Sequence, residues 1–125
     1  MMIDLIRNNK TLVIDDDEFV RGSLEATFNN DKRNLTSVGS GEEGLELMWR
    51  NRFFLIICDY YLPGINGLEF FQRSQKLDDN AIFILITGNG DQEMFDRAWD
   101  LGVDGIIKKP LTINKITSAM ENIME

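Results

Sequence analysis

Four apolar segments of this sequence each end at a polar residue that can bind a metal ion or take part in phosphoryl chemistry. These residues are Asp15, Asp16, Asp59, Thr87 and Lys109. Carboxylate oxygens are the ligands that Mg²⁺ prefers, and an aspartate can act as a covalent phosphoryl acceptor. A hydroxyl and an ammonium group can stabilise charge on the oxygens of a transferred phosphoryl group. The sequence contains no histidine, so it offers neither an imidazole base nor a histidine metal ligand.

The apolar run Phe53–Cys58 is the segment around which the others are arranged. It is too short to span a membrane and indicates a strand that is buried on both faces. Asp59 ends the run, and two turn-forming pairs, Pro63-Gly64 and Asn66-Gly67, follow closely. Asp59 therefore falls at the carboxyl end of a central strand, where ligands of open α/β sheets bind. This position makes it a nucleophile, a metal ligand or a cap for the next loop.

Strands and helices alternate along the whole sequence. Five strands are predicted, at 11–14, 34–38, 54–58, 81–86 and 104–108. Five helices are predicted, at 18–29, 42–50, 66–77, 91–101 and from 112 onward. This alternation predicts an α/β domain with a parallel sheet, and right-handed crossovers bring the carboxyl ends of its strands to one edge. Residues 1–10 are predicted to be loose or to form a short turn, and 29–33 to form a polar loop.

Local signals fix the ends of several helices. Asp17 is the predicted N-cap of the first of these helices, Thr112 caps the last one, and Gly102 ends the helix before the fifth strand. In the helix at 18–29 the spacing predicts one buried apolar stripe. Its members are Phe19, Val20, Leu24 and Phe28.

Length and composition restrict the class of protein. A chain of 125 residues is enough for one domain with a core and too short for two. No apolar run approaches the ~20 residues of a membrane span, and the start does not have the pattern of a signal peptide. The net charge of −8 argues against direct nucleic-acid binding, because phosphate backbones are recognised mainly by Lys and Arg. The single cysteine, Cys58, is predicted to be a core residue, and these features together indicate a cytoplasmic protein.

The acidic residues predict a metal site if the first and third strands are neighbours. Asp15, Asp16 and Asp59 would then lie within a few ångströms, where like charges repel by about 1–4 kcal/mol per pair. A Mg²⁺ ion and the ammonium group of Lys109 would offset this repulsion. The alternative is that Asp15 and Asp16 are exposed acids beside a helix cap, Thr87 a strand-ending residue and Lys109 a surface lysine. Their joint placement at strand ends favours the site.

Four segments resemble the receiver domains of two-component response regulators. They are Leu12–Arg21, Cys58–Gly67, Leu85–Gly88 and Gly102–Pro110. In the order of that family they contain an acidic pair, an Asp followed by Leu-Pro and Asn-Gly, a Thr followed by a small residue, and Lys-Pro. The resemblance covers about residues 10–123, which is nearly the whole chain.

This resemblance implies one receiver domain over residues 1–125, with a flavodoxin-like, five-stranded parallel sheet and helices on both faces. It implies a signalling domain that is not an enzyme. Asp59 would accept a phosphoryl group from the phosphohistidine of a histidine kinase or phosphotransfer protein. Asp16, Asp59 and the backbone carbonyl of Tyr61 would bind Mg²⁺ directly, and Asp15 mostly through water. Lys109 rather than Lys108 is the lysine of the family, because it directly precedes Pro110.

The resemblance also implies a switch. Phosphorylation would draw Thr87 toward the phosphoryl group and change the face built from the helix at 91–101, the strand at 104–108 and the last helix. That face would bind an output partner or a second copy in a phosphorylation-dependent dimer. Ile106 stands where the family usually has an aromatic residue, so the switch is expected to be altered. Tyr61 is expected to shield the phosphoryl group from water, and Phe95 and Trp99 to form a partner surface or to pack in the core.

Parts of the sequence fit three other functions. Gly39-Ser40-Gly41-Glu42-Glu43-Gly44 matches the dinucleotide-binding pattern, but two glutamates stand where a pyrophosphate would lie. Asp15-x-Asp17 is similar to the motif of aspartyl phosphatases of the haloacid dehalogenase class, but Phe19 stands where they have Thr. The third is a receiver-like interaction module that works without phosphorylation, and the complete set of site residues argues against it.

Overall fold

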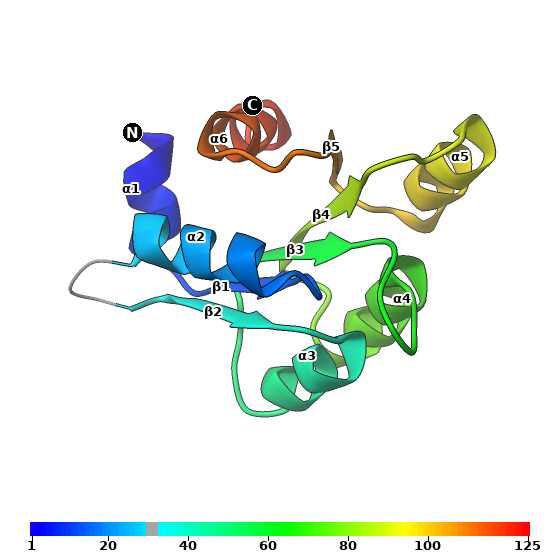
Figure 1. Cartoon of the computed structure of the whole chain (residues 1–125), viewed down its shortest axis with the longest axis horizontal. Coiled ribbons are helices and arrows are strands. Elements are labelled where there is room, and N and C mark those ends of the chain that lie inside the picture. Colours follow the sequence, from blue (N-terminus) through cyan, green and yellow to red (C-terminus); the bar gives the residue numbers. More distant parts are fainter. Residues whose placement is uncertain (30–32) are drawn as a thin grey trace.

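The computed structural model describes residues 1–29 and 33–125, and its centre is a five-stranded parallel sheet in the order β2-β1-β3-β4-β5 (Figure 1). The strands are β1 (Thr11–Ile14), β2 (Leu35–Val38), β3 (Leu55–Asp59), β4 (Ile82–Thr87) and β5 (Gly105–Lys108). All four strand pairs are parallel, so the carboxyl ends of the strands lie at one edge. The flavodoxin-like parallel sheet expected from the sequence is confirmed.

Helices connect the strands and cover both faces of the sheet. They are α1 (Met2–Arg7), α2 (Glu18–Phe28), α3 (Gly41–Met48), α4 (Gly67–Leu77), α5 (Gln92–Leu101) and α6 (Ile113–Ile123). The side chains of Asp17 and Thr112 cap α2 and α6 as predicted, and Gly102 ends α5 in the left-handed conformation with φ 103°. These caps place the starts of α2 and α6 beside the strand ends.

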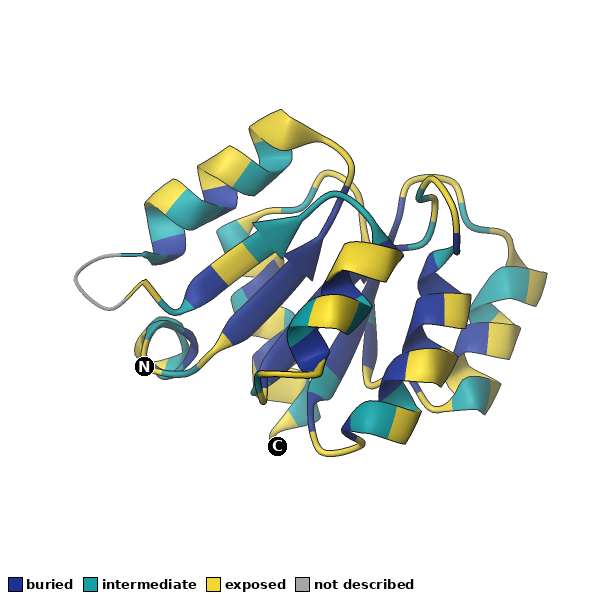
Figure 2. Cartoon of the chain, turned by 90° about the horizontal axis from the view of Figure 1, so that it is seen from below, coloured by how far each residue is buried: buried dark blue, intermediate teal, exposed yellow. Residues whose placement is uncertain are grey.

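The hydrophobic core has two layers, one on each face of the sheet. Side chains of one strand face, including Leu12, Ile56 and Phe83, pack with residues of α3, α4 and α5. Those of the other face, including Val13 and Ile57, pack with residues of α1, α2 and α6. The central strands are buried along their length, and exposed residues lie on the outer faces of the helices and in the loops (Figure 2). A fully apolar strand such as β3 therefore suits a sheet covered on both sides.

The structure differs from two of the sequence-based expectations. Residues 2–7, expected to be loose or a short turn, form the helix α1, whose Ile6 is only 2% exposed in the core layer shared with α2 and α6. Phe19, expected in the buried stripe of α2, is 83% exposed, whereas Leu24 and Phe28 are buried as predicted. Of the polar loop expected at 29–33, residues 30–32 lie outside the described part of the chain.

None of the helices in residues 1–29 and 33–125 is both long enough and apolar enough to cross a membrane.

Candidate functional site

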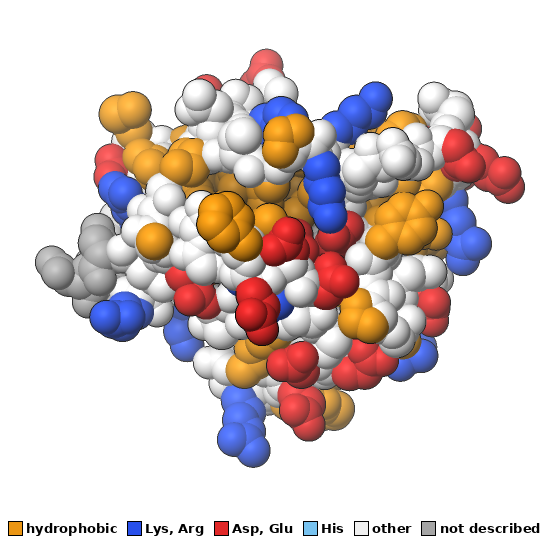
Figure 3. Space-filling model, in the orientation of Figure 1, with side chains coloured by type: hydrophobic (Ala, Val, Ile, Leu, Met, Phe, Trp, Pro, Cys, Tyr) orange, Lys and Arg blue, Asp and Glu red, His pale blue; other side chains and the backbone are white. Residues whose placement is uncertain are grey.

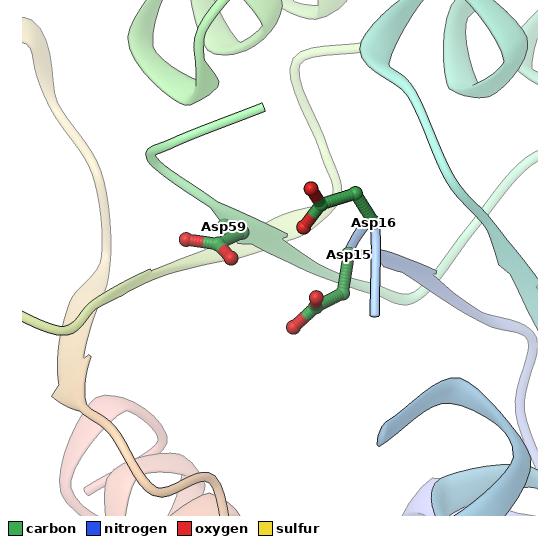
Figure 4. A group of neighbouring side chains, drawn as sticks. All are labelled: Asp15, Asp16 and Asp59. Atoms are coloured by element: carbon green, nitrogen blue, oxygen red, sulfur yellow. The ribbon is translucent and has the colours of Figure 1, made fainter. Parts of the chain in front are cut away.

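Three carboxylates meet where β1 and β3 end. Ile14 pairs with Cys58 in the parallel register, so the next residues, Asp15 and Asp59, are neighbours. Asp16 turns back toward them, and one carboxylate oxygen from each residue lies within 4.8 Å of the others (Figure 4). Asp15 and Asp59 are each only 1% exposed, while Asp16 is open to solvent. The predicted acidic cluster is therefore present, with two buried members and one exposed.

The side chain of Asp15 is held by the start of α2. The backbone N–H of Asp17 donates a hydrogen bond of 2.9 Å to Asp15 Oδ1. Arg21, one turn into α2, donates from its guanidinium group to the backbone carbonyl oxygen of Asp15 at 2.8 Å. The same Asp17 caps the helix, so the helix start and the acidic pair are fixed together. No pattern in the sequence marks Arg21 as a supporting residue, because its hydrogen bond is to a backbone atom.

Lys109 supplies a cation to the cluster. Its Nζ lies 2.6 Å from Asp59 Oδ2, and its side chain is 41% exposed. The backbone N–H of Lys109 donates to the carbonyl oxygen of Thr87 at 2.9 Å, and the Lys109–Pro110 peptide bond is cis. The neighbouring Lys108 instead lies with its Nζ 5.7 Å from the centre of the Phe95 ring. The structure thus brings Lys109, and not Lys108, to the carboxylates.

Thr87 is the last residue of β4 and is fully buried. Its hydroxyl oxygen has no hydrogen-bond partner among the described residues. Leaving a buried hydroxyl without a partner costs about 1–3 kcal/mol. A group that binds beside the hydroxyl and accepts a hydrogen bond would remove this cost.

The segment after Asp59 stays close to its carboxylate. The backbone N–H of Tyr61 donates to Asp59 Oδ1 at 3.3 Å, and the N–H of Gly67 donates to the carbonyl oxygen of Tyr60 at 2.9 Å. A Cβ atom at Gly67 would lie 2.5 Å from the backbone oxygen of Asp59, so only glycine allows α4 to begin this close to β3. Gly64, with φ 76°, gives the turn before α4 its left-handed residue.

The site carries more negative than positive charge. Burial raises the pKa of the Asp15 carboxyl above its ordinary value, the N–H of Asp17 opposes this, and the charges of Asp59 and Asp16 add to it. For Lys109, burial alone would lower the pKa of the ammonium group, but the hydrogen bond to Asp59 and the three negative charges outweigh it and raise the pKa. Three carboxylates face one ammonium group, so the site fits a divalent cation with oxygen ligands. Figure 3 shows the red carboxylates together near the centre of this face.

A largely apolar cavity of about 560 Å³ adjoins the carboxylates, between the start of α2 and the segment after β5. Asp15, Asp17 and Lys109 line one end. The rest of its lining is Phe19, Val20, Ser23, Leu24, Pro110 and Leu111. The sequence could not identify this surface, because Phe19 has the spacing of a buried residue and only its position in the fold shows that it faces outward.

The glycine-rich segment Gly39–Gly44 has a packing role in this structure. Ser40 caps α3 by accepting a hydrogen bond from the N–H of Glu43 at 3.2 Å. A Cβ atom at Gly41 would lie 2.8 Å from a side-chain carbon of Ile65, and one at Gly44 would lie 2.7 Å from Ile14 Cδ1. The close approach of α3 to its neighbours therefore accounts for two of the three glycines without a dinucleotide.

A five-stranded parallel sheet of this order, with two acids directly after β1, an acid ending β3, a threonine ending β4 and a lysine after β5, defines a receiver domain of two-component signalling. The sequence pattern of the response regulator receiver domain matches residues 11–121. The chain belongs to this family of regulators.

Curated relatives and solved structures agree with this assignment. The chain is 33% identical over 117 residues to a probable chemotaxis protein CheY of Rhizobium etli, with 91% of each chain covered. It is 27% identical over 117 residues to the sporulation initiation phosphotransferase F of Bacillus subtilis, with 94% of each covered. A receiver domain from Clostridium thermocellum has a similar structure, with a TM-score of 0.81, 25% identity and coverage of 92% of this chain and 93% of that one.

One further structural relative was solved in a modified state. It is a response regulator protein from Burkholderia pseudomallei with a phosphorylated aspartic acid, a calcium ion and citrate. The TM-score is 0.82 at 25% identity, and the match covers 92% of this chain and 68% of that one.

Proposed function

We propose that this domain is a phosphoacceptor in which Asp59 receives a phosphoryl group from the phosphohistidine of a histidine kinase or phosphotransfer protein. The observation that carries the proposal is the position of Asp59 at the end of β3. Its carboxylate is 1% exposed, lies beside Asp15 and Asp16 and is 2.6 Å from the ammonium group of Lys109. The Burkholderia relative, whose structure contains a phosphorylated aspartic acid, supports the same chemistry here.

The oxygen ligands at this edge fit Mg²⁺. Asp15, Asp16 and Asp59 would hold it together with the backbone carbonyl of Tyr61, a residue whose N–H donates a hydrogen bond to Asp59. When bound, the ion supplies positive charge that offsets the three carboxylates and the oxygens of a transferred phosphoryl group. Asp16 is the exposed member, so a hydrated ion can reach the site from its side.

Three residues of the chain have defined roles in the proposed transfer. One oxygen of Asp59 forms a bond to phosphorus while the bond from phosphorus to the histidine nitrogen breaks, and that electron pair returns to the imidazole. The ammonium group of Lys109 pairs with the phosphoryl oxygens and the hydroxyl of Thr87 donates a hydrogen bond to them. These groups stabilise charge by position and need no base in the chain, which agrees with the absence of histidine.

The apolar cavity beside Lys109 suits the donor protein. Phe19, 83% exposed at the cavity edge, and Leu111 offer apolar contact next to the reactive carboxylate. Large aromatic side chains at the centre of an interface contribute much of its binding energy. A helix of the donor that carries the phosphohistidine would contact this surface as phosphorus approaches Asp59.

Phosphorylation of Asp59 would also change the part of the sheet edge where β4 and β5 end. It adds a charge of about −1.5 to −2 next to Thr87. Movement of Thr87 would pull on β4 and on the face formed by α5, β5 and α6, which would then bind a partner or a second copy. Ile106 on β5 is half-buried and aliphatic, so this face would respond by repacking of an alkyl chain and not by rotation of an aromatic ring.

A regulatory role agrees with the named relatives, of which one is a chemotaxis protein and one a phosphotransferase of sporulation. The two remaining alternatives, an aspartyl phosphatase and an interaction module, predict different outcomes when the chain is given a phosphodonor. An aspartyl phosphatase would turn over a generic phosphate ester many times, and an interaction module without phosphorylation would never be labelled. A phosphoacceptor takes up one phosphoryl group.

Incubation with acetyl phosphate and Mg²⁺, followed by intact mass spectrometry, tests the proposal. The wild-type chain is expected to gain one phosphoryl group and Asp59→Asn none. Asp79→Asn removes an exposed acid that is not part of the acidic cluster, so it is the matched control and should be labelled like the wild type. Equal labelling of Asp59→Asn, or no labelling of the wild type, would contradict the proposed function.

A further inference from the structure

The side chain of Lys115 reaches back from the first turn of α6 to the segment that carries Lys109. Its Nζ donates hydrogen bonds to the carbonyl oxygen of Lys108 at 2.9 Å and to that of Pro110 at 3.0 Å. These carbonyl groups belong to the residues immediately before and after Lys109. One ammonium group therefore bonds to both sides of the lysine that contacts Asp59.

Lys115 occupies a position in α6 that usually disfavours a positively charged side chain. It is the third residue of the helix, where the positive end of the helix dipole disfavours an ammonium group, and the first turn of α6 contains no acid. Its own backbone N–H donates to the Thr112 cap at 3.2 Å. The two carbonyl oxygens are the groups that compensate its charge, and hydrogen bonds from an ionised donor are roughly twice as strong as neutral ones.

The other hydrogen bonds of Lys109 are on the side of β3 and β4. Its backbone N–H bonds to the carbonyl oxygen of Thr87, which ties it to the end of β4, and its Nζ bonds to Asp59. The chain leaves β5 at Lys108, so beyond this point no strand pairing holds it. The bonds from Lys115 stand in place of that pairing.

We propose that Lys115 is a positioning residue, which fixes the two carbonyl groups flanking Lys109 and so keeps the Lys109 ammonium group on Asp59. The inference rests on the proposed function, since Lys109 acts there on the phosphoryl group.

Two variants and one control separate positioning from charge. Lys115→Met removes the ammonium group while keeping an unbranched side chain, and Lys115→Arg restores a donor that can reach carbonyl oxygens. Lys108→Met removes the neighbouring cation, whose ammonium group lies over Phe95 and away from these carbonyls. Lys115 and Lys108 are both exposed, so all three variants are expected to fold, and circular dichroism with thermal unfolding checks this.

The first readout is the rate of labelling by acetyl phosphate with Mg²⁺. The labelling rate of Lys115→Met is expected to be lower by roughly fivefold to tenfold. Misplacing a charge-stabilising group raises the activation barrier, and each kcal/mol slows the reaction by about that factor. Lys115→Arg and Lys108→Met should stay within about twofold of the wild type, a change that corresponds to less than half a kcal/mol. Equal slowing of Lys115→Met and Lys108→Met would overturn the inference, since charge alone would then explain both.

The second readout does not depend on phosphorylation. Hydrogen exchange of the Lys109 amide, which bonds to Thr87, is measured by NMR without a phosphodonor. It should be faster in Lys115→Met than in the wild type and be restored in Lys115→Arg. Unchanged exchange overturns the inference even if labelling succeeds. A wild-type chain that is never labelled contradicts the proposed function, and the exchange measurement still decides whether Lys115 holds this segment.

Discussion

The buried carboxylate of Asp15 lies beside two other acids, and this arrangement opposes folding of the metal-free protein. Burial, with added repulsion from Asp59 and Asp16, raises the pKa of Asp15 above its ordinary value of 3.8. The folded state therefore binds its proton more tightly than the unfolded state does. Stability from this group is lost as the pH rises from 3.8 through the raised value, and the ionised form is destabilising at neutral pH.

Asp15→Asn is expected to raise the free energy of unfolding of the metal-free protein by roughly 1 kcal/mol at neutral pH, because it removes one of three like charges. The gain should shrink as the pH falls through 3.8, and below that value Asp15 becomes protonated in both states. Urea unfolding in the presence of a chelator, at several pH values, measures it. Asp79→Asn serves as the control without change. A loss of stability in Asp15→Asn would contradict this account of the charge cluster.

Tyr61 is the second residue whose effect can be isolated. The residue is 61% exposed, and its ring meets the Tyr60 ring edge to face, with centroids 4.9 Å apart. We expect the ring to shield a phosphoryl group on Asp59 from water. Tyr61→Ala should then lose the phosphoryl group several-fold faster, which corresponds to a hydrolysis barrier lower by on the order of 1 kcal/mol. Tyr61→Phe keeps the ring and should lose the group at the wild-type rate. An unchanged rate in Tyr61→Ala, followed by intact mass over time, would show that the ring gives no protection.

At the scale of helices and strands, the start of α4 depends on the close approach of Gly67 to β3. A Cβ atom there would lie 2.5 Å from the backbone oxygen of Asp59 and 2.9 Å from Tyr60 Cα. These two atoms belong to the backbone and cannot move aside without shifting the segment that holds Asp59, and the third close atom is Leu85 Cδ1 at 2.9 Å. This element therefore joins helix packing to the geometry of the site.

Gly67→Ala is expected to destabilise the domain by about 1–3 kcal/mol, the usual cost of forcing an atom into a packed position. Gly22→Ala in α2 is the matched control, because a Cβ atom there has no atom within 4 Å. It should stabilise the helix by up to about 1 kcal/mol, since alanine is the better helix former. Chemical unfolding of both variants gives the comparison. If Gly67→Ala were as stable as Gly22→Ala, the close approach would not matter.

The sequence predicted the elements that have strong local signals and missed those fixed by tertiary contact. Apolar runs that end at acids gave β1 and β3, and the caps Asp17 and Thr112 gave the starts of two helices. The helix α1 was not predicted, because six residues are too few for a periodic pattern and its stability comes from Ile6 in the core. Helical spacing predicts a buried Phe19, because spacing alone does not show whether a residue at the edge of the apolar face of a helix is covered or exposed.

The site was predictable in its parts because all strands of a parallel sheet end at one edge, whereas the structure was needed to show that β1 and β3 are neighbours. Asp15, Asp16, Asp59, Thr87 and Lys109 all end strands or follow them, and the sheet brings them to one edge. The supporting bonds of Arg21 and Lys115 were not predictable. Both side chains bond to backbone carbonyl oxygens, which every residue carries, so no residue type in the sequence marks the partner.

At the scale of the whole molecule, the excess of carboxylates couples metal binding to folding. A ligand that binds only the folded state stabilises it, by about 2.7 kcal/mol when its concentration is a hundred times its Kd. The acidic cluster forms only when β1 and β3 pair, so the unfolded chain has no such site.

Mg²⁺ is therefore expected to raise the thermal unfolding temperature of the wild-type domain in a concentration-dependent way. Asp16→Asn, which removes an exposed member of the cluster, should weaken the effect strongly, whereas Asp79→Asn should keep it. Differential scanning calorimetry across a Mg²⁺ titration measures the shift. A shift of equal size in Asp16→Asn would mean that the ion binds elsewhere.

The position of the phosphoryl group on the chain is the most direct test of the central claim. After incubation with acetyl phosphate and Mg²⁺, reduction with borohydride converts an aspartyl phosphate into homoserine, and peptide mass spectrometry locates the changed residue. We predict homoserine at position 59 alone, and none when a chelator removes the metal. Modification of another aspartate in place of Asp59, or none in the presence of Mg²⁺, would contradict the account.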